Sequence, residues 1–160
     1  MVLVREIAAD DWELMRDVRL AALAEAPYAF GSTHAGEVDF TEERWRGRIS
    51  ERSVTFFAHE ETADVAPAGL AGVYVEDGEP ELVSMWVRPS ARGLGVGEAL
   101  VEAAAAWAKT RDFRSLFLWV TESNPPAVRL YKRCGFIPTG ESQPLPSDPT
   151  LAEIRMRREL

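Results

Sequence analysis

A glycine-rich turn between a predicted strand and a predicted helix most constrains how this chain can fold. The turn is Arg92-Gly93-Leu94-Gly95-Val96-Gly97. The run before it, from Glu81 to Val87, is rich in β-favouring residues, and the run after it, from Glu98 to Lys109, consists of strong helix formers. The first N–H groups of a helix have no intrahelical partner, and the helix dipole adds partial positive charge there. We therefore predict a phosphate site, which the glycines let the backbone approach closely.

Two common glycine motifs match this turn poorly. A P-loop requires Lys followed by Ser or Thr at the end of the turn, whereas Gly97 is followed by Glu98 and Ala99. A dinucleotide fingerprint requires G-x-G-x-x-G at the start of a βαβ unit. Here the spacing is G-x-G-x-G, and the preceding pair of strands is predicted to be an antiparallel hairpin through Asp77-Gly78.

Hydrophobic periodicity, caps and breakers divide the rest of the chain into alternating elements. The caps that we expect are Asp10 or Asp11, Thr41 and Asn124. We predict an α/β fold of one domain, residues 1–160, with a mixed, mostly antiparallel central sheet of about seven strands flanked by about four helices. Strands are expected at 2–7, 54–59, 68–76, 81–87, 115–121, 136–141 and 151–158, helices at 12–25, 41–49, 98–109 and 125–134, and loops at 28–34 and 143–149.

Charge and composition narrow the class of partner. The net charge of −8 argues against nucleic-acid binding. The segment from Met85 to Cys134 holds eight basic and four acidic residues, so it carries +4 and the remainder −12. This asymmetry is either chance placement on the surface or an anion site on a body that favours cationic partners. No apolar run is long enough to span a membrane, and the single cysteine, Cys134, fits a cytoplasmic protein. The sequence is also compatible with a homodimer.

Three segments in order resemble the GCN5-related N-acetyltransferase family, and together they cover most of the domain. The turn Arg92 to Gly97 is similar to the family's Arg/Gln-x-x-Gly-x-Gly/Ala turn, and Met85-Trp86-Val87-Arg88-Pro89 is similar to the strand end that precedes it. The segment Asn124 to Phe136 is similar to the family's Asn-x-x-Ala-x-x-Leu-Tyr-x-x-x-Gly-Phe. Two such motifs, separated by a helix and a strand, are highly specific.

The resemblance implies acetyl-CoA as co-substrate, with no metal. It implies that the pyrophosphate binds the glycine turn, that the pantetheine arm lies in a wedge where two central strands splay apart, and that Asn124 contacts this arm. The backbone of Met85 and Val87 would bind the arm. The implied cofactor-binding residues are Met85, Trp86, Val87, Arg92, Gly93, Leu94, Gly95, Val96, Gly97, Glu98, Asn124, Ala127, Val128 and Tyr131.

Tyr131 is the candidate general acid. Acyl transfer from a thioester to an amine releases a thiolate that needs a proton, since a free thiol has a pKa of about 8.5. A phenol of pKa ~10 can hydrogen-bond that thiolate and protonate it. Tyr131 follows Asn124 by seven residues, which is about two helical turns, so both lie on nearly the same face. The alternative is that Tyr131 only packs in the core.

The general base is less defined. Some relatives place a Glu at the start of the strand before the turn, and Glu81 matches that position, although it is equally compatible with an exposed residue beside a turn. The ribosomal-protein branch has a Glu twelve residues before the tyrosine, where this chain has Trp119, which argues against that base and that substrate class. Glu76, Glu122 and a water chain are alternatives.

The acceptor is expected to be a small-molecule or peptide amine, and the acidic remainder of the chain favours a cationic one. In the family the loop between the first two helices borders the acceptor pocket. The candidate substrate-binding residues are Tyr28, Phe30, Ser32 and Trp119, with His34 and Trp86 nearby, although Phe30 could equally anchor the core. The alternative function is a non-catalytic acyl-CoA-binding or regulatory module on the same fold.

Overall fold

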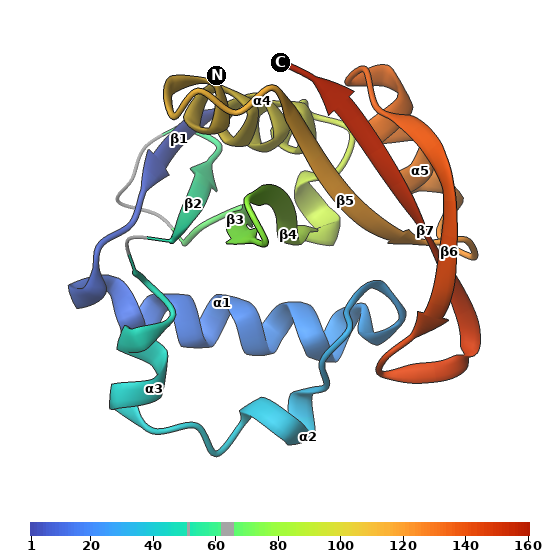
Figure 1. Cartoon of the computed structure of the whole chain (residues 1–160). Helices are drawn as coiled ribbons and strands as arrows, with labels where there is room; N and C mark the ends of the chain where they lie inside the picture. Colours follow the sequence, from blue (N-terminus) through green and yellow to red (C-terminus); the bar gives the residue numbers. More distant parts are fainter. Residues whose placement is uncertain (51, 62–65) are drawn as a thin grey trace.

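A seven-stranded sheet in the order β1-β2-β3-β4-β5-β7-β6 organises the molecule (Figure 1). This computed structural model describes residues 1–50, 52–61 and 66–160. Neighbouring strands are antiparallel except for β4 and β5, which are parallel. The predicted α/β fold with a mixed, mostly antiparallel sheet is confirmed. The strands are β1 (Leu3–Glu6), β2 (Ser53–His59), β3 (Gly69–Glu76), β4 (Glu79–Val87), β5 (Ser115–Thr121), β6 (Ile137–Leu145) and β7 (Asp148–Glu159).

Helices cover both faces of the sheet. In Figure 1, α1 to α3 lie below the sheet and α4 lies above it. The α1-side cluster packs α1 and α3 against Phe57, Leu70 and Trp86, whereas the α4-side cluster packs α4 and α5 against the other face of the strands. The helices are α1 (Trp12–Glu25), α2 (His34–Glu37), α3 (Glu42–Gly47), α4 (Val96–Thr110) and α5 (Pro125–Arg133), with 3₁₀ turns at Ala9–Asp11, Pro27–Ala29 and Pro89–Ala91.

Most predicted helix caps have a different role from the one expected. Thr41 does cap α3, because its hydroxyl accepts a hydrogen bond from the Arg44 N–H at 3.2 Å. Asp11 precedes α1, but its carboxylate accepts from the Ala8 N–H and pairs with Arg5 instead. Asn124 precedes α5 without a side-chain cap bond, so its amide is available for another partner.

Our prediction of a loop at residues 143–149 is wrong. Strand β6 continues to Leu145, and β7 begins at Asp148, so only Pro146 and Ser147 form the turn of a hairpin. The prolines misled the prediction. Pro138 and Pro144 lie on β6, which is the edge of the sheet, and an edge strand tolerates a residue that lacks an N–H.

Among the described residues, no helix is both long enough and apolar enough to cross a lipid bilayer.

Candidate active site

β4 and β5 separate within the sheet, and a cavity lies between them. The two strands pair only at Glu81 with Phe117 and at Leu82 with Leu118. Beyond these pairs a cavity of about 540 Å³ opens, with walls from β4, the turn before α4, β5, α5 and the segment after α1. The predicted splaying of two central strands is therefore present, and it brings the two sequence motifs to one cavity.

A bulge in β4 accompanies this separation. Leu70 of β3 pairs with Trp86, whereas Gly72 pairs with Val83, so two residues of β4, Ser84 and Met85, oppose one residue of β3. Ser84 has a φ of +59°, in the left-handed region. The extra residue changes which side chains face each side, because Met85 now packs against the α4-side cluster and Trp86 against the α1-side cluster.

The glycine turn forms an open cradle at one end of the cavity. Gly93 and Gly95 have φ values of +79° and +84°, and a Cβ on either would meet no atom within 4 Å. Helix α4 begins directly after Gly95 without a side-chain cap, so the N–H groups of its first turn have no intrahelical acceptor. This arrangement fits the pyrophosphate of coenzyme A. Of the predicted turn residues, Arg92, Gly93, Gly95, Val96, Gly97 and Glu98 line the cavity, whereas Leu94 is exposed and does not.

Arg92 is held beside this cradle by two contacts. Its Nε donates to the Val87 carbonyl at 3.0 Å, and its Nη2 pairs with Glu25 Oε2 at 2.8 Å. The same Glu25 oxygen accepts the indole N–H of Trp86 at 2.8 Å. Glu25 thus joins the end of α1 to the predicted phosphate turn, and no sequence pattern indicated it.

Gly97 allows α5 to approach α4. A Cβ at Gly97 would lie 2.9 Å from Leu130 Cδ2 and 3.5 Å from Met85 Cε. A larger residue would push Leu130, and with it the neighbouring Tyr131, away from the turn. The glycine at this position therefore sets the distance between the two motifs.

Tyr131 lies in the wall of the cavity on α5. Its side chain is buried and meets Phe136 edge-on, with ring centroids 5.9 Å apart. Burial raises the pKa of Tyr131, and the neighbouring Cys134 adds to the shift, so the phenol keeps its proton at neutral pH. Within the described part of the chain no group hydrogen-bonds the hydroxyl. Asn124 and Ala127 also line the cavity, whereas Val128 packs against the α4-side cluster.

The segment after α1 closes the opposite side of the cavity. Tyr28 lines the cavity together with Trp119 of β5, and the Tyr28 carbonyl accepts the Thr121 hydroxyl at 2.7 Å. Phe30 is buried in the α1-side cluster, and Ser32 is half-buried; neither lines the cavity. The structure therefore brings two of the four predicted acceptor residues together, and His34 is exposed.

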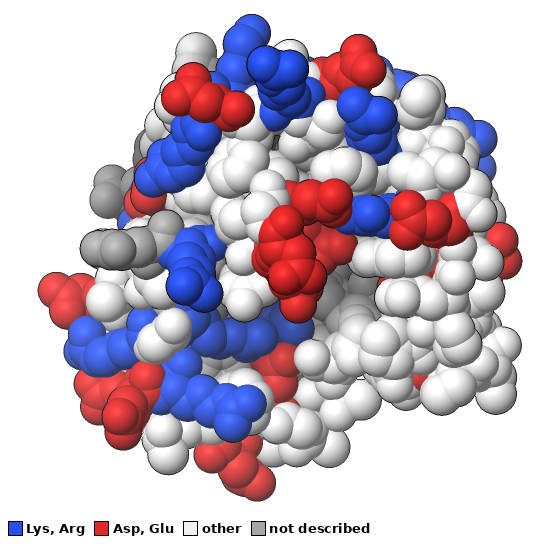
Figure 2. All heavy atoms as spheres, in the orientation of Figure 1, with Lys and Arg blue, Asp and Glu red and all other residues white. Residues whose placement is uncertain are grey.

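Glu81 does not line the cavity. It lies on β4 in the first of the two pairs that join β4 to β5, one residue before the last pair at Leu82, and is half-buried. Burial raises the pKa of Glu81, Arg155 opposes that shift, and the charges of Glu76, Glu153 and Glu79 add to it. Figure 2 shows acidic side chains gathered near the centre of one face, beside a hollow. Glu76 and Glu122, the weaker candidates for a base, are exposed and likewise lie outside the cavity lining.

Several lining residues were not predicted. Leu82, Val83 and Ser84 belong to the same strand as Met85 and line the cavity where β4 separates from β5; no local pattern indicated the bulge at Ser84. Arg129, Leu130 and Arg133 lie on the predicted helix within the second motif, so its helical periodicity could have indicated them.

Comparison with known proteins agrees with this geometry. The acetyltransferase (GNAT) family model matches residues 14–136. This chain belongs to that family. Members use acetyl-CoA, and among the described residues no group of three or more His, Cys, Asp or Glu could hold a metal ion.

Individual relatives of known sequence match only part of this chain. The chain is 36% identical over 73 residues to a provisionally named [ribosomal protein bS18]-alanine N-acetyltransferase of Bacillus subtilis (strain 168), covering 46% of this chain and 48% of that protein. The chain thus spans about half the length of that relative, and less of several others.

Solved structures show the same fold over nearly the whole chain. A GCN5-related N-acetyltransferase from Kribbella flavida has a TM-score of 0.72 and 26% identity, covering 99% of this chain and 98% of that one. A spermidine N-acetyltransferase from Vibrio cholerae, solved with CoA and spermine, has a TM-score of 0.79 at 19% identity, covering 99% and 95%.

Proposed function

We propose that this protein transfers the acetyl group of acetyl-CoA to a primary amine, by direct transfer while both substrates are bound. One observation carries the proposal. A single cavity joins a glycine-lined helix N-terminus at one end to a buried, protonated phenol in its wall. Phosphate binding alone explains the first feature, but it does not require the second.

The binding residues are those of the two motifs. The N–H groups from Gly93 to Glu98, with Arg92 beside them, bind the pyrophosphate. Ser84 and Met85 have no ladder partner on β3 or β5, so the backbone of this stretch is available to hydrogen-bond the pantetheine arm. Asn124 lines the same cavity with an amide that caps no helix, and it contacts the arm from the α5 side.

Tyr131 supplies the proton at the leaving group. Acetyl-CoA brings the acyl group as a thioester, and its cleavage leaves a thiolate. Because burial raises the pKa of Tyr131, its hydroxyl is a proton donor throughout the neutral range. The hydroxyl has no competing acceptor in the described part of the chain, so it can turn toward the sulfur.

The amine must lose a proton before it attacks, because an alkylammonium has a pKa of about 10.4. We assign this proton to water that leads to Glu81. Burial raises the pKa of Glu81, which brings it nearer to the neutral pH at which a base works best. Since Glu81 does not line the cavity, it acts through water and does not touch the amine.

The acceptor enters from the side of Tyr28 and Trp119. Two aromatic rings and the carboxylates around Glu81 favour a cationic amine, on a small molecule or a peptide. Phe30 and Ser32 support this side from outside the cavity lining. The relative from Bacillus subtilis is named for a ribosomal protein, but the tryptophan at position 119 favours a different acceptor.

The test is thiol release from acetyl-CoA over a panel of amines, with Tyr131→Phe as the diagnostic variant. We expect turnover by the wild type and a loss of about 10²–10⁴-fold in kcat for Tyr131→Phe, with CoA affinity kept. Tyr74→Phe is the matched control, since Tyr74 is exposed on β3 and outside the cavity lining. CoA binding without turnover on a broad panel would instead support an acyl-CoA-binding module.

We further propose that residues 1–160 act as one domain in the cytoplasm, which the single, buried cysteine favours.

A further inference from the structure

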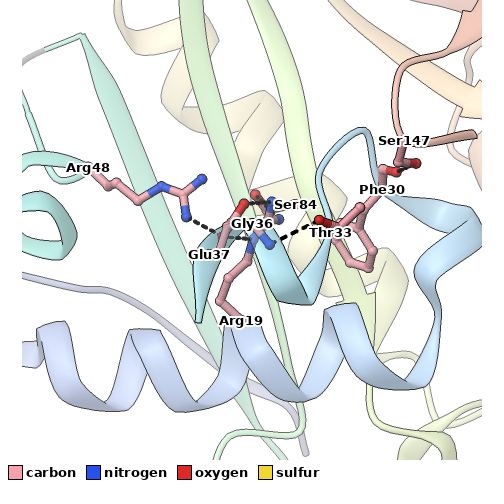
Figure 3. A network of polar contacts seen from close by, with 8 residues as sticks. All are labelled: Arg19, Phe30, Thr33, Gly36, Glu37, Arg48, Ser84 and Ser147. Carbon is pink, nitrogen blue, oxygen red and sulfur yellow. Dashed lines mark hydrogen bonds and ion pairs between the residues drawn. The ribbon is translucent and has the colours of Figure 1, made fainter. Parts of the chain in front are cut away.

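A buried ion-pair cluster lies outside the cavity, between α1, α2 and the segment after α3 (Figure 3). Arg19 of α1 binds Glu37 of α2 through two parallel hydrogen bonds, from Nε to Oε1 and from Nη2 to Oε2, both 3.0 Å long. Their side chains are 7% and 3% exposed. Arg48 adds a third bond to Glu37 Oε1 at 2.7 Å. Glu37 is thereby fully paired, and it fixes the plane of the Arg19 guanidinium.

The remaining nitrogen of Arg19 leaves this cluster and contacts β4. Nη1 donates to the Ser84 hydroxyl at 3.0 Å, between residues 65 positions apart in the chain. The planar guanidinium can make the paired bonds to Glu37 and this third bond at once, whereas a lysine ammonium cannot reproduce that geometry. Arg19 therefore connects a carboxylate on the α1 side to one residue of the central sheet.

Ser84 is the residue of β4 whose backbone most needs such support. Its φ is +59°, which residues with a side chain rarely adopt, and the equivalent bulge position usually holds glycine. Neither Ser84 nor Met85 has a ladder partner on β3 or on β5, so the sheet itself does not hold this backbone. The Arg19 bond is the hydrogen bond that the Ser84 side chain makes within the described residues.

The conformation of Ser84 decides what faces the cavity. Because the bulge inserts one residue, Met85 and Trp86 are shifted to opposite faces from those that simple alternation after Leu82 would give. Ser84, Met85 and Trp86 all line the cavity, opposite the motifs on α4 and α5. Arg19 also lies over the Phe30 ring, 4.9 Å from its centroid, so it contacts the segment that follows Tyr28 as well.

We propose that Arg19, oriented by Glu37, is a positioning residue for acetyl transfer. It holds Ser84 in the left-handed conformation and so fixes the β4 backbone along which the pantetheine arm of CoA binds. This inference rests on the proposed function only for the identity of the ligand. It predicts that a residue at position 84 that adopts a positive φ at no cost makes the Arg19 bond unnecessary.

The test compares four variants: Ser84→Ala, Ser84→Gly, Arg19→Lys, and Arg19→Lys combined with Ser84→Gly. Ser84→Ala loses the bond but keeps the cost of a positive φ, so kcat/KM for acetyl-CoA should fall about tenfold or more and CoA should bind correspondingly more weakly. Ser84→Gly loses the same bond without that cost, so its kcat/KM should exceed that of Ser84→Ala by about threefold or more. Arg19→Lys should be impaired like Ser84→Ala, and adding Ser84→Gly should restore its kcat/KM to that of Ser84→Gly alone.

The rescue separates positioning from a merely structural role. If Arg19 served only to fill the core and neutralise Glu37, Ser84→Gly would not restore the Arg19→Lys variant, and the proposal would be overturned. Equal kcat/KM for Ser84→Ala and the wild type would overturn it as well. Thermal midpoints of the two Ser84 variants should differ by no more than the roughly 2–4 °C that this strain costs, and both variants should be fully folded at the assay temperature, which excludes unfolding as the cause.

Two readouts do not depend on catalysis. If the wild type binds CoA but acetylates no amine, the proposed function fails, whereas the CoA affinities of the four variants still decide the role of Arg19. If the wild type binds no CoA, a crystal structure of Ser84→Ala decides whether Arg19 holds the bulge. We expect residue 84 to leave the left-handed region and the bulge to move, and an unchanged bulge would refute the inference.

Discussion

Gly95→Ala tests the phosphate turn with little risk to the fold. Gly95 has a φ of +84°, and a Cβ there would meet nothing within 4 Å, so the variant suffers strain but no clash. The left-handed conformation costs an alanine about 1–2 kcal/mol, and reduced freedom of the unfolded chain offsets about 0.4–1 kcal/mol of that. We expect a net loss of about 1 kcal/mol in the free energy of unfolding, or roughly 2–4 °C in the thermal midpoint.

Gly140→Ala is its matched control. Gly140 has a φ of +94°, and a Cβ there would also meet nothing within 4 Å, but it lies on the edge strand β6 outside the cavity lining. The two variants should therefore lose the same stability in denaturant unfolding. Any difference between the two variants in CoA binding therefore reports on the turn and not on backbone strain.

The two variants should differ in CoA binding. The added methyl group at Gly95 stands on the backbone that we propose approaches the pyrophosphate, so calorimetry at neutral pH should show binding weakened at least about tenfold, or ~1.4 kcal/mol. Gly140→Ala should bind CoA as the wild type does. Equal dissociation constants for the two variants would refute the assignment of the turn.

Two further predictions concern stability. Burial alone would raise the pKa of Glu37, but Arg19 and Arg48 outweigh it and lower that pKa from 4.5 to about 2. The lowered pKa stabilises the fold above pH ~4.5, and this stabilisation of about 3 kcal/mol is lost as the pH falls toward 2. In denaturant unfolding at stepped pH, the difference in free energy of unfolding between the wild type and Glu37→Gln should shrink over that window. A difference that stays constant would contradict this prediction. Gly69→Ala should lose about 3 kcal/mol in the free energy of unfolding, because a Cβ there would lie 2.6 Å from the Trp86 carbonyl oxygen. Gly47→Ala is the control: a Cβ there would meet nothing within 4 Å, so its free energy of unfolding should stay within about 0.5 kcal/mol of the wild type.

Local patterns in the sequence predicted most elements, and the reason is visible in the structure. Helix α4 and strand β5 are continuous runs of matching propensity, and the glycine turn between β4 and α4 needs φ values that only glycine adopts easily. Both strands of the β6–β7 hairpin were predicted, but their extension to a tight turn was missed because the prolines lie on an edge strand, where pairing to β7 outweighs their local preference.

The candidate site was predicted less completely, because part of it depends on contacts between distant residues. Tyr131 and the turn follow from motifs, so their common cavity could be expected. The bulge at Ser84 and its bond to Arg19 join residues that no local period relates. Phe30 shows the same limit, since the sequence left acceptor binding and core anchoring equally open, and its packing in the α1-side cluster supports core anchoring.

Glu25 allows a last prediction, whose sign is opposite to that of most changes in a binding site. Its carboxylate pairs with Arg92 at 2.8 Å and therefore offsets positive charge beside the proposed phosphate turn. Glu25→Gln keeps an oxygen for the Trp86 indole and removes the charge. Since a charge within a few ångströms in water is worth about 1 kcal/mol, CoA binding should tighten about three- to fivefold at low salt, with the gain fading as salt increases.

A suitable control for this change is Glu60→Gln. Glu60 pairs with Arg88 at 3.3 Å and does not line the cavity, so its removal should leave the CoA dissociation constant unchanged. Weaker CoA binding by Glu25→Gln would mean that Glu25 holds Arg92 and Trp86 in place more than it competes for their charge. Arg92 would then contribute to CoA binding through the position that Glu25 gives it more than through its net charge, because the unpaired N–H groups of the α4 N-terminus are the same in both proteins.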